Sequence, residues 1–427
     1  MSGAFGSRSL SRSSLAIAAF STIVEWYDFT LYLYFATVLS RVFFGESAAS
    51  LLVTLAGFAV AYLMRPLGAV FFGHLGDRHG RRKMMLASVA LMTAAMLLMA
   101  LLPTREQIGP AAGALFIGLR CVMGFAVGGE YTGVVAYLLE GAPVARRGLI
   151  ASLAAAASEV GALLAVVAAA LTVNFVDAPA LDSWGWRVPF FIGVALASTV
   201  WIARSTMEES PDFERQVSAG TVPAAPLLHV LAEHRPGIAR GFAISALGSI
   251  TYYVGITYVP TFLTSIGSLT EGASLTLSSW AAVVVILVTP LTGLLSDRIG
   301  RKPVLLLLCV CSAILPLALF SMMAHGSTAN ALIGALALAG VAGGVSAVGA
   351  VATAEQFPGE GRLSGLALGE TLATAIFGGV TPFLAQWLMG VTGWALIPGA
   401  MIAIVALGVL PVLVRMPETA PVAFPKA

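Results

Sequence analysis

The chain has 427 residues, of which 58% are hydrophobic and only 10% are charged, and its mean hydropathy is +0.92. Soluble domains carry about 25% charged residues, so this composition excludes a soluble globular protein and a disordered chain. The formal net charge of +2 leaves no strongly basic face for nucleic acid. The composition therefore predicts an integral membrane protein.

Twelve apolar stretches follow one another along the chain, and a bilayer crossing takes about 20 mostly apolar residues. Only helices satisfy their own backbone polar groups in lipid at this length, so we predict an all-α membrane protein with twelve transmembrane helices. The predicted spans are 15–44, 51–73, 84–102, 111–140, 149–176, 188–204, 238–266, 272–295, 303–324, 331–357, 363–391 and 394–415.

The distribution of Lys and Arg predicts the orientation of these spans, because basic residues concentrate on the cytoplasmic side of a membrane. If the N-terminus is inside, most of the 23 basic residues fall in inner segments, and the outer loops hold only Arg41, Arg105 and Arg187. Arg65 and Arg120 lie within predicted spans. We therefore expect both termini to be cytoplasmic.

A polar stretch at 205–237 divides the chain into two halves of six predicted spans each, 1–204 and 238–427. The second span is followed by GHLGDRHGRRK in the first half and by GLLSDRIGRKP in the second half. A Glu-x-x-Pro-x-x-x-Arg motif follows the fourth span of each half. Shared motifs at matching positions indicate a duplicated six-helix unit. Parallel repeats of this kind rock against each other around a site near the bilayer midplane, as in transporters.

These repeated motifs supply the candidate residues of a cytoplasmic gate. In each D-R-x-G-R-[RK] loop, Gly80 or Gly300 permits a tight reversal, and the arginines face anionic headgroups. The loops are interpreted as topology markers with an Asp–Arg latch, and a gating latch would break such charge pairs in one access state. The candidate gating residues are Asp77, Arg81, Asp297, Arg301, Glu140, Arg147, Glu355 and Arg362.

Ionisable residues inside the spans need a reason, because a charge at the bilayer centre costs about 2.5–3.5 kcal/mol. Glu25 and Asp28 share one face of the first span, roughly 15 Å or more from its inner end. Arg120 lies near the middle of the fourth span. A carboxylate paired with this arginine stays ionised in a dry interior, and it takes up a proton when the pair breaks. The pair is therefore interpreted as a proton-coupling device, with a static link between helices as the alternative.

Glu159 in the fifth span and Glu370 in the eleventh are further acids at membrane depth, and no basic residue is near either of them in the sequence. Each is interpreted as a proton carrier, as a binding group for a cationic moiety or as a neutral hydrogen-bonding acid, with a structural role as the alternative. Together with Glu25, Asp28 and Arg120, they complete the predicted set of proton-coupling and substrate-binding residues.

Two sets of uncharged residues predict how the helices meet. Small residues at close-packing spacing in spans four and ten predict tight helix apposition; they are Gly124, Gly128, Gly129, Gly133, Gly340, Gly343, Gly344 and Gly349. Aromatic residues of spans one and seven are candidates for lining a cavity, with lipid contact as an equal alternative; they are Trp26, Tyr27, Tyr32, Tyr34, Tyr252, Tyr253 and Tyr258.

No motif indicates catalysis or a cofactor. The GxGxxG and GxxxxGK[ST] patterns are absent from the sequence, which excludes ATP-driven transport by this chain alone. The three cysteines, Cys121, Cys309 and Cys311, lie within apolar runs and predict neither a disulfide nor a metal site. We expect a protein that is not an enzyme and that uses no cofactor and no metal.

The two D-R-x-G-R-[RK] loops in a six-plus-six layout resemble the major facilitator superfamily. Within it, the chain is similar to the metabolite:proton symporters, a group that includes proline/betaine, 2-oxoglutarate, citrate and shikimate transporters. The segments that carry this resemblance are VEWYDFTLYLYFA (24–36), YLMRPLG (62–68), GGEYTG (128–133), WGWRVPFFIG (184–193), MEESPDF (207–213), EQFP (355–358) and ATAIFGGVTP (373–382).

The resemblance implies proton-coupled uptake of a small polar metabolite, carboxylate-bearing or zwitterionic, through the bacterial inner membrane. The expected partners are this solute, protons and the lipid bilayer, without nucleic acid, and the expected functional unit is a monomer. Asp28 and Arg120 resemble the proton-coupling pair of related sugar porters. Glu159 and Glu370 stand where the family has uncharged residues, which keeps an anion, a zwitterion and a cation open as substrate. The alternatives are a proton-driven sugar-type porter, an efflux antiporter and a sensor that does not transport.

Overall fold

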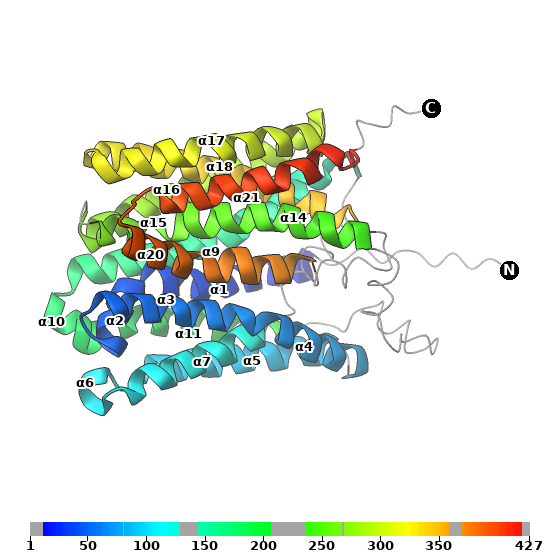
Figure 1. The fold of residues 1–427 in the computed structure, drawn as a ribbon. Coiled ribbons are helices and arrows are strands. Elements are labelled where there is room, and N and C mark those ends of the chain that lie inside the picture. Colours follow the sequence, from blue (N-terminus) through cyan, green and yellow to red (C-terminus); the bar gives the residue numbers. More distant parts are fainter. Residues whose placement is uncertain are drawn as a thin grey trace, which may run out of the picture.

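The computed structural model describes residues 12–79, 81–128, 144–205, 235–266, 269–357 and 369–420. Figure 1 shows these residues as a long bundle whose helices run roughly along one common direction. The described residues are mostly helical, and none of them lies in a β-strand. The all-α class is therefore confirmed.

The first half of the chain places α4, α5 and α7 in the lower part of Figure 1. Its helices are α1 (Arg12–Tyr34), α2 (Ala36–Phe44), α3 (Ala48–Leu63), α4 (Arg65–His79), α5 (Arg81–Ala100), α6 (Arg105–Ile108), α7 (Ala111–Val127), η1 (Val144–Arg146), α9 (Arg147–Phe175), α10 (Ala178–Ala180), η2 (Leu181–Gly185) and α11 (Arg187–Ser205).

The second half fills the upper part of the same view, with α17, α18, α16 and α21 furthest from α5 and α7. Its helices are α14 (Arg235–Tyr252), η3 (Tyr253–Thr257), α15 (Val259–Ser265), α16 (Glu271–Ile299), α17 (Arg301–His325), α18 (Thr328–Ala354), η5 (Ala375–Val380), α20 (Thr381–Thr392) and α21 (Ile397–Arg415).

Each of the twelve predicted spans contains at least one of these helices. Within the described ranges, nine helices are long and apolar enough to cross a membrane, or ten if the bent pair Arg235–Thr257 and Val259–Ser265 counts as one span. The fourth predicted span is described only as far as residue 128, and its helix α7 is correspondingly short. Most of the predicted central loop, 206–234, lies outside the described residues, so the domain boundaries stay a prediction.

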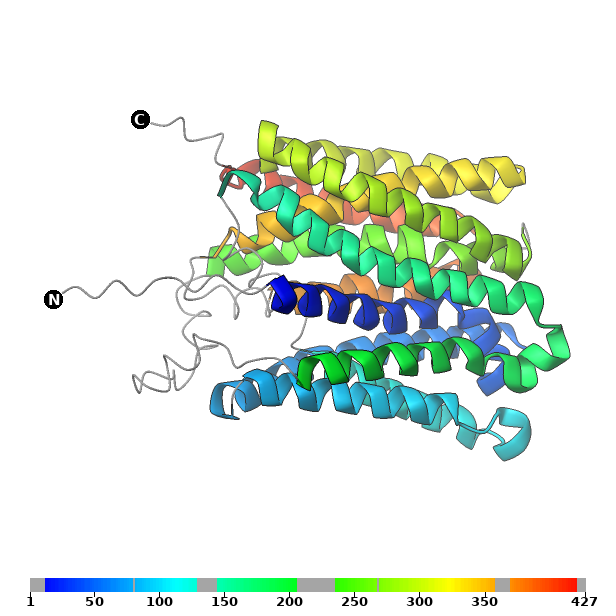
Figure 2. The same cartoon turned by 180° about the vertical axis from the view of Figure 1, so that it is seen from behind.

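The two halves meet along several pairs of helices. α9 of the first half packs along α16 of the second, and α3 packs against η5 and α20. α18 also contacts α9, and α1 contacts η3 and α15. In both views of the bundle, α1 begins and α21 ends at the same end (Figures 1 and 2). We refer to that end as the predicted cytoplasmic end.

Two π-helical segments interrupt helices of the second half where it faces the first. η3 is followed by Pro260 and η5 by Pro382. A proline has no N–H for the carbonyl four residues earlier, and its ring clashes with that carbonyl, so it kinks or interrupts a regular helix. The chain bends by 46° between η3 and α15. π-helical turns inside helices occur frequently at functional sites.

Two of the helices that extend beyond their predicted spans carry the acids of the repeated motifs. α16 continues to Ile299, so Asp297 lies in its last turn, and α4 likewise includes Asp77. The prediction that both acids lie in loops is wrong, because hydropathy marks the hydrocarbon thickness, whereas polar residues continue a helix beyond it. The reversal in the second half is made by Gly300 at φ +109°, as predicted, and Gly80 lies outside the described residues.

The predicted close packing of span four is confirmed where it is described. A Cβ on Gly124 would lie 2.0 Å from the carbonyl oxygen of Ala61, and one on Gly128 would lie 2.2 Å from that of Arg65. Only glycine allows α7 to approach α3 and α4 this closely. In span ten the prediction is wrong for Gly340, where a Cβ would meet no atom within 4 Å. Gly129 and Gly133 lie outside the described residues.

Candidate functional site

A cavity lies between the two halves, and both halves contribute side chains to it. The volume of this cavity is about 120 Å³. Glu159 lies roughly 18 Å along α9 from the first residue of that helix, at 1.5 Å per residue, and this depth is near the middle of a hydrocarbon core about 30 Å thick. The charged and aromatic lining residues are Trp26, Arg65, Glu159, Tyr252, Tyr253 and Glu370.

The predicted pair of Asp28 and Arg120 is present inside the first half. Nη1 of Arg120 on α7 donates a hydrogen bond of 2.9 Å to Oδ2 of Asp28 on α1. Both side chains are 0% exposed, so each charge depends on the other in place of water. Neither residue is among those that line the cavity.

The Asp28–Arg120 contact is a single hydrogen bond with unused donors around it. Nε and Nη2 of Arg120 and Oδ1 of Asp28 have no hydrogen-bond partner within the described ranges. The guanidinium lies over the ring of Tyr32, 4.6 Å from its centroid, and 5.5 Å from that of Phe29. Cation–π attraction therefore replaces part of the missing hydrogen bonding. Such a contact is weaker than a bidentate fork and opens with the loss of one bond.

Glu25 has a different arginine as its partner. Nη2 of Arg65, the first residue of α4, donates a hydrogen bond of 2.8 Å to Oε1 of Glu25. Sequence analysis placed Arg65 in a span but gave it no role. Its position was the available signal, because a basic residue at membrane depth needs a partner as much as Arg120 does. Arg65, unlike Arg120, lines the cavity.

The ring of Phe29 lies between the two arginines. Its centroid is 4.5 Å from Cζ of Arg65 and 5.5 Å from Cζ of Arg120. Phe29 follows Asp28 directly on α1, and Glu25 is one turn earlier on the same helix. α1 therefore connects the ion pair at the cavity with the ion pair buried behind it.

Glu159 and Glu370 face the cavity from opposite halves. Glu159 on α9 is 3% exposed, and Glu370 is partly buried. In the described part of the chain, neither carboxyl forms an ion pair with a basic side chain. The Tyr252 hydroxyl is within electrostatic reach of Glu159, but it has no hydrogen-bond partner of normal geometry among the described residues. Both acids thus lack a counter-charge of their own.

Aromatic side chains from both halves meet at the end of the cavity that lies beside the last residue of α14. Trp26 packs edge to face on Tyr252, with ring centroids 5.3 Å apart. The hydroxyls of Tyr62 and Tyr253 form a hydrogen bond between the halves. These contacts hold α1 and α3 against the π-helical region of the second half.

The prediction that aromatic residues line a cavity holds for part of the set. Trp26, Tyr252 and Tyr253 are lining residues. Tyr27 and Tyr32 instead donate hydrogen bonds to backbone carbonyls within the first half. Tyr34 and Tyr258 are buried and do not line the cavity either. All seven lie on two predicted spans, and the sequence does not show which face of each span turns toward the cavity.

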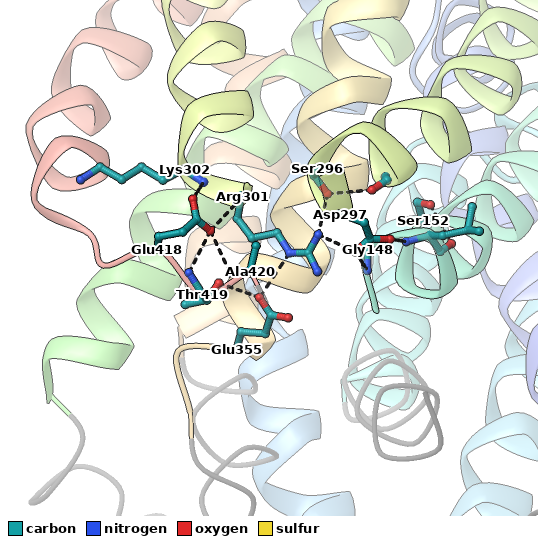
Figure 3. Close-up of polar contacts among 12 residues, drawn as sticks. Gly148, Ser152, Ser296, Asp297, Arg301, Lys302, Glu355, Glu418, Thr419 and Ala420 are labelled. Carbon is teal, nitrogen blue, oxygen red and sulfur yellow. Dashed lines mark hydrogen bonds and ion pairs between the residues drawn. The ribbon is translucent and has the colours of Figure 1, made fainter. Parts of the chain in front are cut away.

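A latch joins the two halves at the predicted cytoplasmic end (Figure 3). The carboxylate of Asp297 accepts hydrogen bonds of 2.9 Å from the backbone N–H groups of Gly148 and Leu149. These are among the first residues of α9, whose N-cap residue, Arg146, makes no capping hydrogen bond with its side chain. A carboxylate at a helix N-terminus satisfies free N–H groups and interacts favourably with the helix dipole. An acid of the second half therefore caps a helix of the first.

The second half holds Asp297 in place through Arg301. Nη1 of Arg301 donates 2.7 Å to Oδ1 of Asp297, and Nε lies 3.4 Å from Oε2 of Glu355. The predicted Asp–Arg latch and the predicted pairing of Glu355 with a loop arginine are both present. Glu418, near the end of the described chain, accepts hydrogen bonds from the N–H groups of Arg301 and Lys302 and so caps α17 (Figure 3).

A second contact between the halves lies at the opposite end of the bundle. Arg41 on α2 forms an ion pair with Glu271, the first residue of α16. Both terminal nitrogens of Arg41 take part, since Nη2 also lies 3.2 Å from Oε2 of Glu271. Asp182 is 3.4 Å from the same nitrogen. Charged contacts therefore connect the two halves on both sides of the cavity.

The remaining candidate gating residues are only partly described. Arg147 begins α9 next to the latch, and its Nε has no hydrogen-bond partner among the described residues. The side chains of Asp77 and Arg81 lie outside the described residues, as do Glu140 and Arg362. The latch is thus seen for one of the two repeats.

The described ranges hold neither a metal cluster nor a disulfide. No group of three or more His, Cys, Asp and Glu residues in these ranges is arranged to hold a metal ion. Cys121, Cys309 and Cys311 are free. The chemistry of the cavity is that of carboxylates, a guanidinium and aromatic rings.

Known proteins of similar sequence and fold are membrane transporters. Residues 15–225 match the family described as Sugar (and other) transporter, and residues 268–427 match the Major Facilitator Superfamily. The ectoine/proline transporter of Corynebacterium glutamicum is 32% identical over 395 residues, which cover 89% of this chain and 78% of that protein. The citrate-proton symporter of Klebsiella pneumoniae is 32% identical over 396 residues, which cover 90% and 87% of the two chains.

Among solved structures, a D-xylose-proton symporter aligns with 95% of this chain and 98% of its own, with a TM-score of 0.75. The two sequences are 21% identical. This likeness supports the fold, and it carries no information about the solute.

Proposed function

Because the chain belongs to the major facilitator superfamily, within its metabolite:proton symporters, we propose that it takes up a small polar metabolite, carboxylate-bearing or zwitterionic, together with protons. It is a multi-pass membrane protein and not an enzyme. The proposed location is the bacterial inner membrane, with both termini cytoplasmic. We propose a functional monomer, because both halves of one chain contribute lining residues to the cavity.

The observation that carries the proton-coupling proposal is the Asp28–Arg120 pair, 2.9 Å apart and fully buried. While the pair is closed, the guanidinium stabilises the ionised carboxylate. When the pair opens in the same dry surroundings, the carboxyl is stabilised by taking up a proton. Protonation of Asp28 thereby becomes linked to the position of α1 relative to α7.

α1 provides a physical connection between this step and the solute. Glu25 on the same helix bonds the cavity-lining Arg65, and the Phe29 ring contacts both arginines. A solute that binds Arg65 would weaken the hydrogen bond between Arg65 and Glu25 and so shift α1. We propose that Glu25 and Arg65 relay solute occupancy to the Asp28–Arg120 pair, and that the halves then rock about the cavity.

Uptake into proteoliposomes tests this function. We expect accumulation of a radiolabelled amino acid, betaine or organic acid when the outside is acidic, and loss of the accumulated solute when a protonophore is added. Asp28→Asn should abolish uphill uptake and retain exchange of preloaded solute, because it removes the proton site and keeps the cavity. Glu106→Gln, at an exposed position on α6, is the matched control and should behave like the unmodified protein.

Two results would contradict the proposal. Uphill uptake that is unchanged in Asp28→Asn would remove Asp28 from the coupling mechanism. Extrusion driven by the same gradient would instead identify an efflux antiporter.

A further inference from the structure

The described lining of the cavity has more acidic than basic side chains. Of its charged lining residues, Arg65 is the one cation within the described ranges, and it is bonded to Glu25. Glu159 and Glu370 line the same cavity, and neither is in an ion pair with a described basic residue. Arg120 does not relieve this imbalance, because it is bonded to Asp28 outside the cavity lining.

A carboxylate in such a place is stabilised by a ligand of opposite charge. Glu159 is 3% exposed, and a carboxyl away from water stays neutral unless an opposite charge pairs with its ionised form. A cation that enters the cavity would supply the missing counter-charge. A ligand with several carboxylates would meet both acids, and its only described positive contact would be an arginine already bonded to Glu25.

The aromatic surroundings suit an alkylated ammonium group in particular. Trp26 and Tyr252 line the cavity with their rings at 86° to each other, so their faces point in different directions, and it is the face of a ring that attracts a cation. A cation within about 6 Å of an aromatic face is attracted to it, and tryptophan is the strongest partner. The Tyr252 hydroxyl is buried, 4% exposed as a residue, and has no hydrogen-bond partner of normal geometry in the described structure.

We propose that Glu159 and Glu370, together with the rings of Trp26 and Tyr252, form a binding site for the ammonium group of an organic solute. This inference rests on the proposed transport function and narrows its carboxylate-bearing or zwitterionic substrate to solutes that carry an amine or quaternary ammonium group, to the exclusion of di- and tricarboxylates without one. The two acids belong to different halves, so the bound cation draws the halves together around it.

Equilibrium binding to the purified protein in detergent, without any proton gradient, tests the site. We expect saturable binding of radiolabelled choline, a quaternary ammonium without a carboxylate, that unlabelled 2-oxoglutarate does not displace. Glu159→Gln and Glu370→Gln should each weaken choline binding about tenfold or more, the range expected for a lost bond to a charged group. The conservative variants Glu159→Asp and Glu370→Asp should retain most of the binding.

Matched controls separate a lost site from a lost fold. Glu106→Gln removes an exposed acid on α6 and should leave choline binding unchanged. Each variant is required to keep the unfolding temperature of the unmodified protein within a few degrees before its binding is compared. Absence of saturable choline binding to the unmodified protein, or its displacement by 2-oxoglutarate, would overturn the inference.

The outcome is independent of the test of transport. Choline binding without gradient-driven uptake of any solute would leave the site in place and refute the symporter. Gradient-driven uptake of 2-oxoglutarate without choline binding would retain the symporter and refute the ammonium site.

Discussion

Glu25 and Asp28 show that two acids on one helix in the membrane interior can each have their own partner of opposite charge. They are three positions apart on α1, yet each bonds its own arginine, Arg65 in one case and Arg120 in the other. Because both carboxylates are buried, the free-energy cost of removing each charge from water is offset by its arginine partner and by aromatic rings. Phe29 contacts both guanidiniums, so the two pairs are physically coupled.

Removal of both members of the buried pair is expected to cost less than the sum of the two single removals. Asp28→Asn and Arg120→Gln should each lower the free energy of unfolding by about 3–5 kcal/mol, because each leaves a buried charge without its partner. The double variant should be more stable than the sum of the two losses predicts, with an interaction energy of about 0.5–3 kcal/mol. Denaturant titration in detergent measures all four proteins.

The exposed Glu106→Gln change provides the baseline for this comparison. Strict additivity of the two losses would show that Asp28 and Arg120 do not stabilise each other, and it would remove the physical basis of the proposed coupling.

At the scale of helices, backbone contact decides the packing. Gly124 brings α7 against the backbone of α3, and Gly148 brings the start of α9 against α16, where a Cβ would lie 2.7 Å from Oδ1 of Asp297. The helix ends are completed in the same way, since Asp297 caps α9 and Glu418 caps α17 from elsewhere in the chain. The N-termini of α9 and α17 are therefore capped by acids from other parts of the chain.

Gly124→Ala and Gly118→Ala test this on a single helix. A Cβ at Gly124 would lie 2.0 Å from the Ala61 carbonyl oxygen, whereas one at Gly118 would meet nothing within 4 Å. Gly124→Ala should lower the free energy of unfolding by about 1–3 kcal/mol through overpacking. Gly118→Ala should be neutral or stabilise by up to about 1 kcal/mol through helix propensity. Equal effects of the two changes on the unfolding transition would contradict the close helix contact.

Viewed as a whole, the molecule has a cavity between two halves that are linked at both ends. Asp297 connects them at the predicted cytoplasmic end, and Arg41 connects them at the other. Alternating access requires that these contacts open in turn. The latch and the Arg41 ion pair therefore oppose each other across the cavity.

Release of the latch is expected to open its own end. Spin labels on the exposed positions Arg146 and Arg298, in a variant without the native cysteines, report the separation of the halves there. Asp297→Asn should increase the population with the longer separation about 5–30-fold, because loss of the charge at the start of α9 and of one of its two acceptor oxygens costs about 1–2 kcal/mol. Arg41→Ala should leave the shorter separation dominant, since it frees the opposite end.

Asp177→Asn, an exposed acid near η2, is the control and should not change the distance distribution. An identical response of Asp297→Asn and Arg41→Ala would show that the two contacts do not act on opposite ends.

Most charged residues of the candidate site could be predicted from the sequence, but not all of their ion-pair partners could. A carboxyl or guanidinium in an apolar span is conspicuous because its insertion cost is high, so Asp28, Arg120, Glu159 and Glu370 were all predicted to matter. Arg120 was the clearest basic residue at midspan, so an acid of the first span was predicted to pair with it, and the resemblance to sugar porters pointed to Asp28. The role of Arg65 was missed, since its bond to Glu25 depends on how α4 lies against α1.

The sequence by itself determined the membrane class, the helical spans and the two-half organisation, because hydropathy and repeated motifs are local properties that survive whatever the helices pack against. Only the tertiary structure decided which acids have a counter-ion, which aromatic rings line the cavity, and that Asp297 caps a helix of the other half. Those features depend on the rotation and depth of one helix relative to another. Such relations are set by side-chain packing between segments far apart in the chain, which no single stretch of sequence encodes.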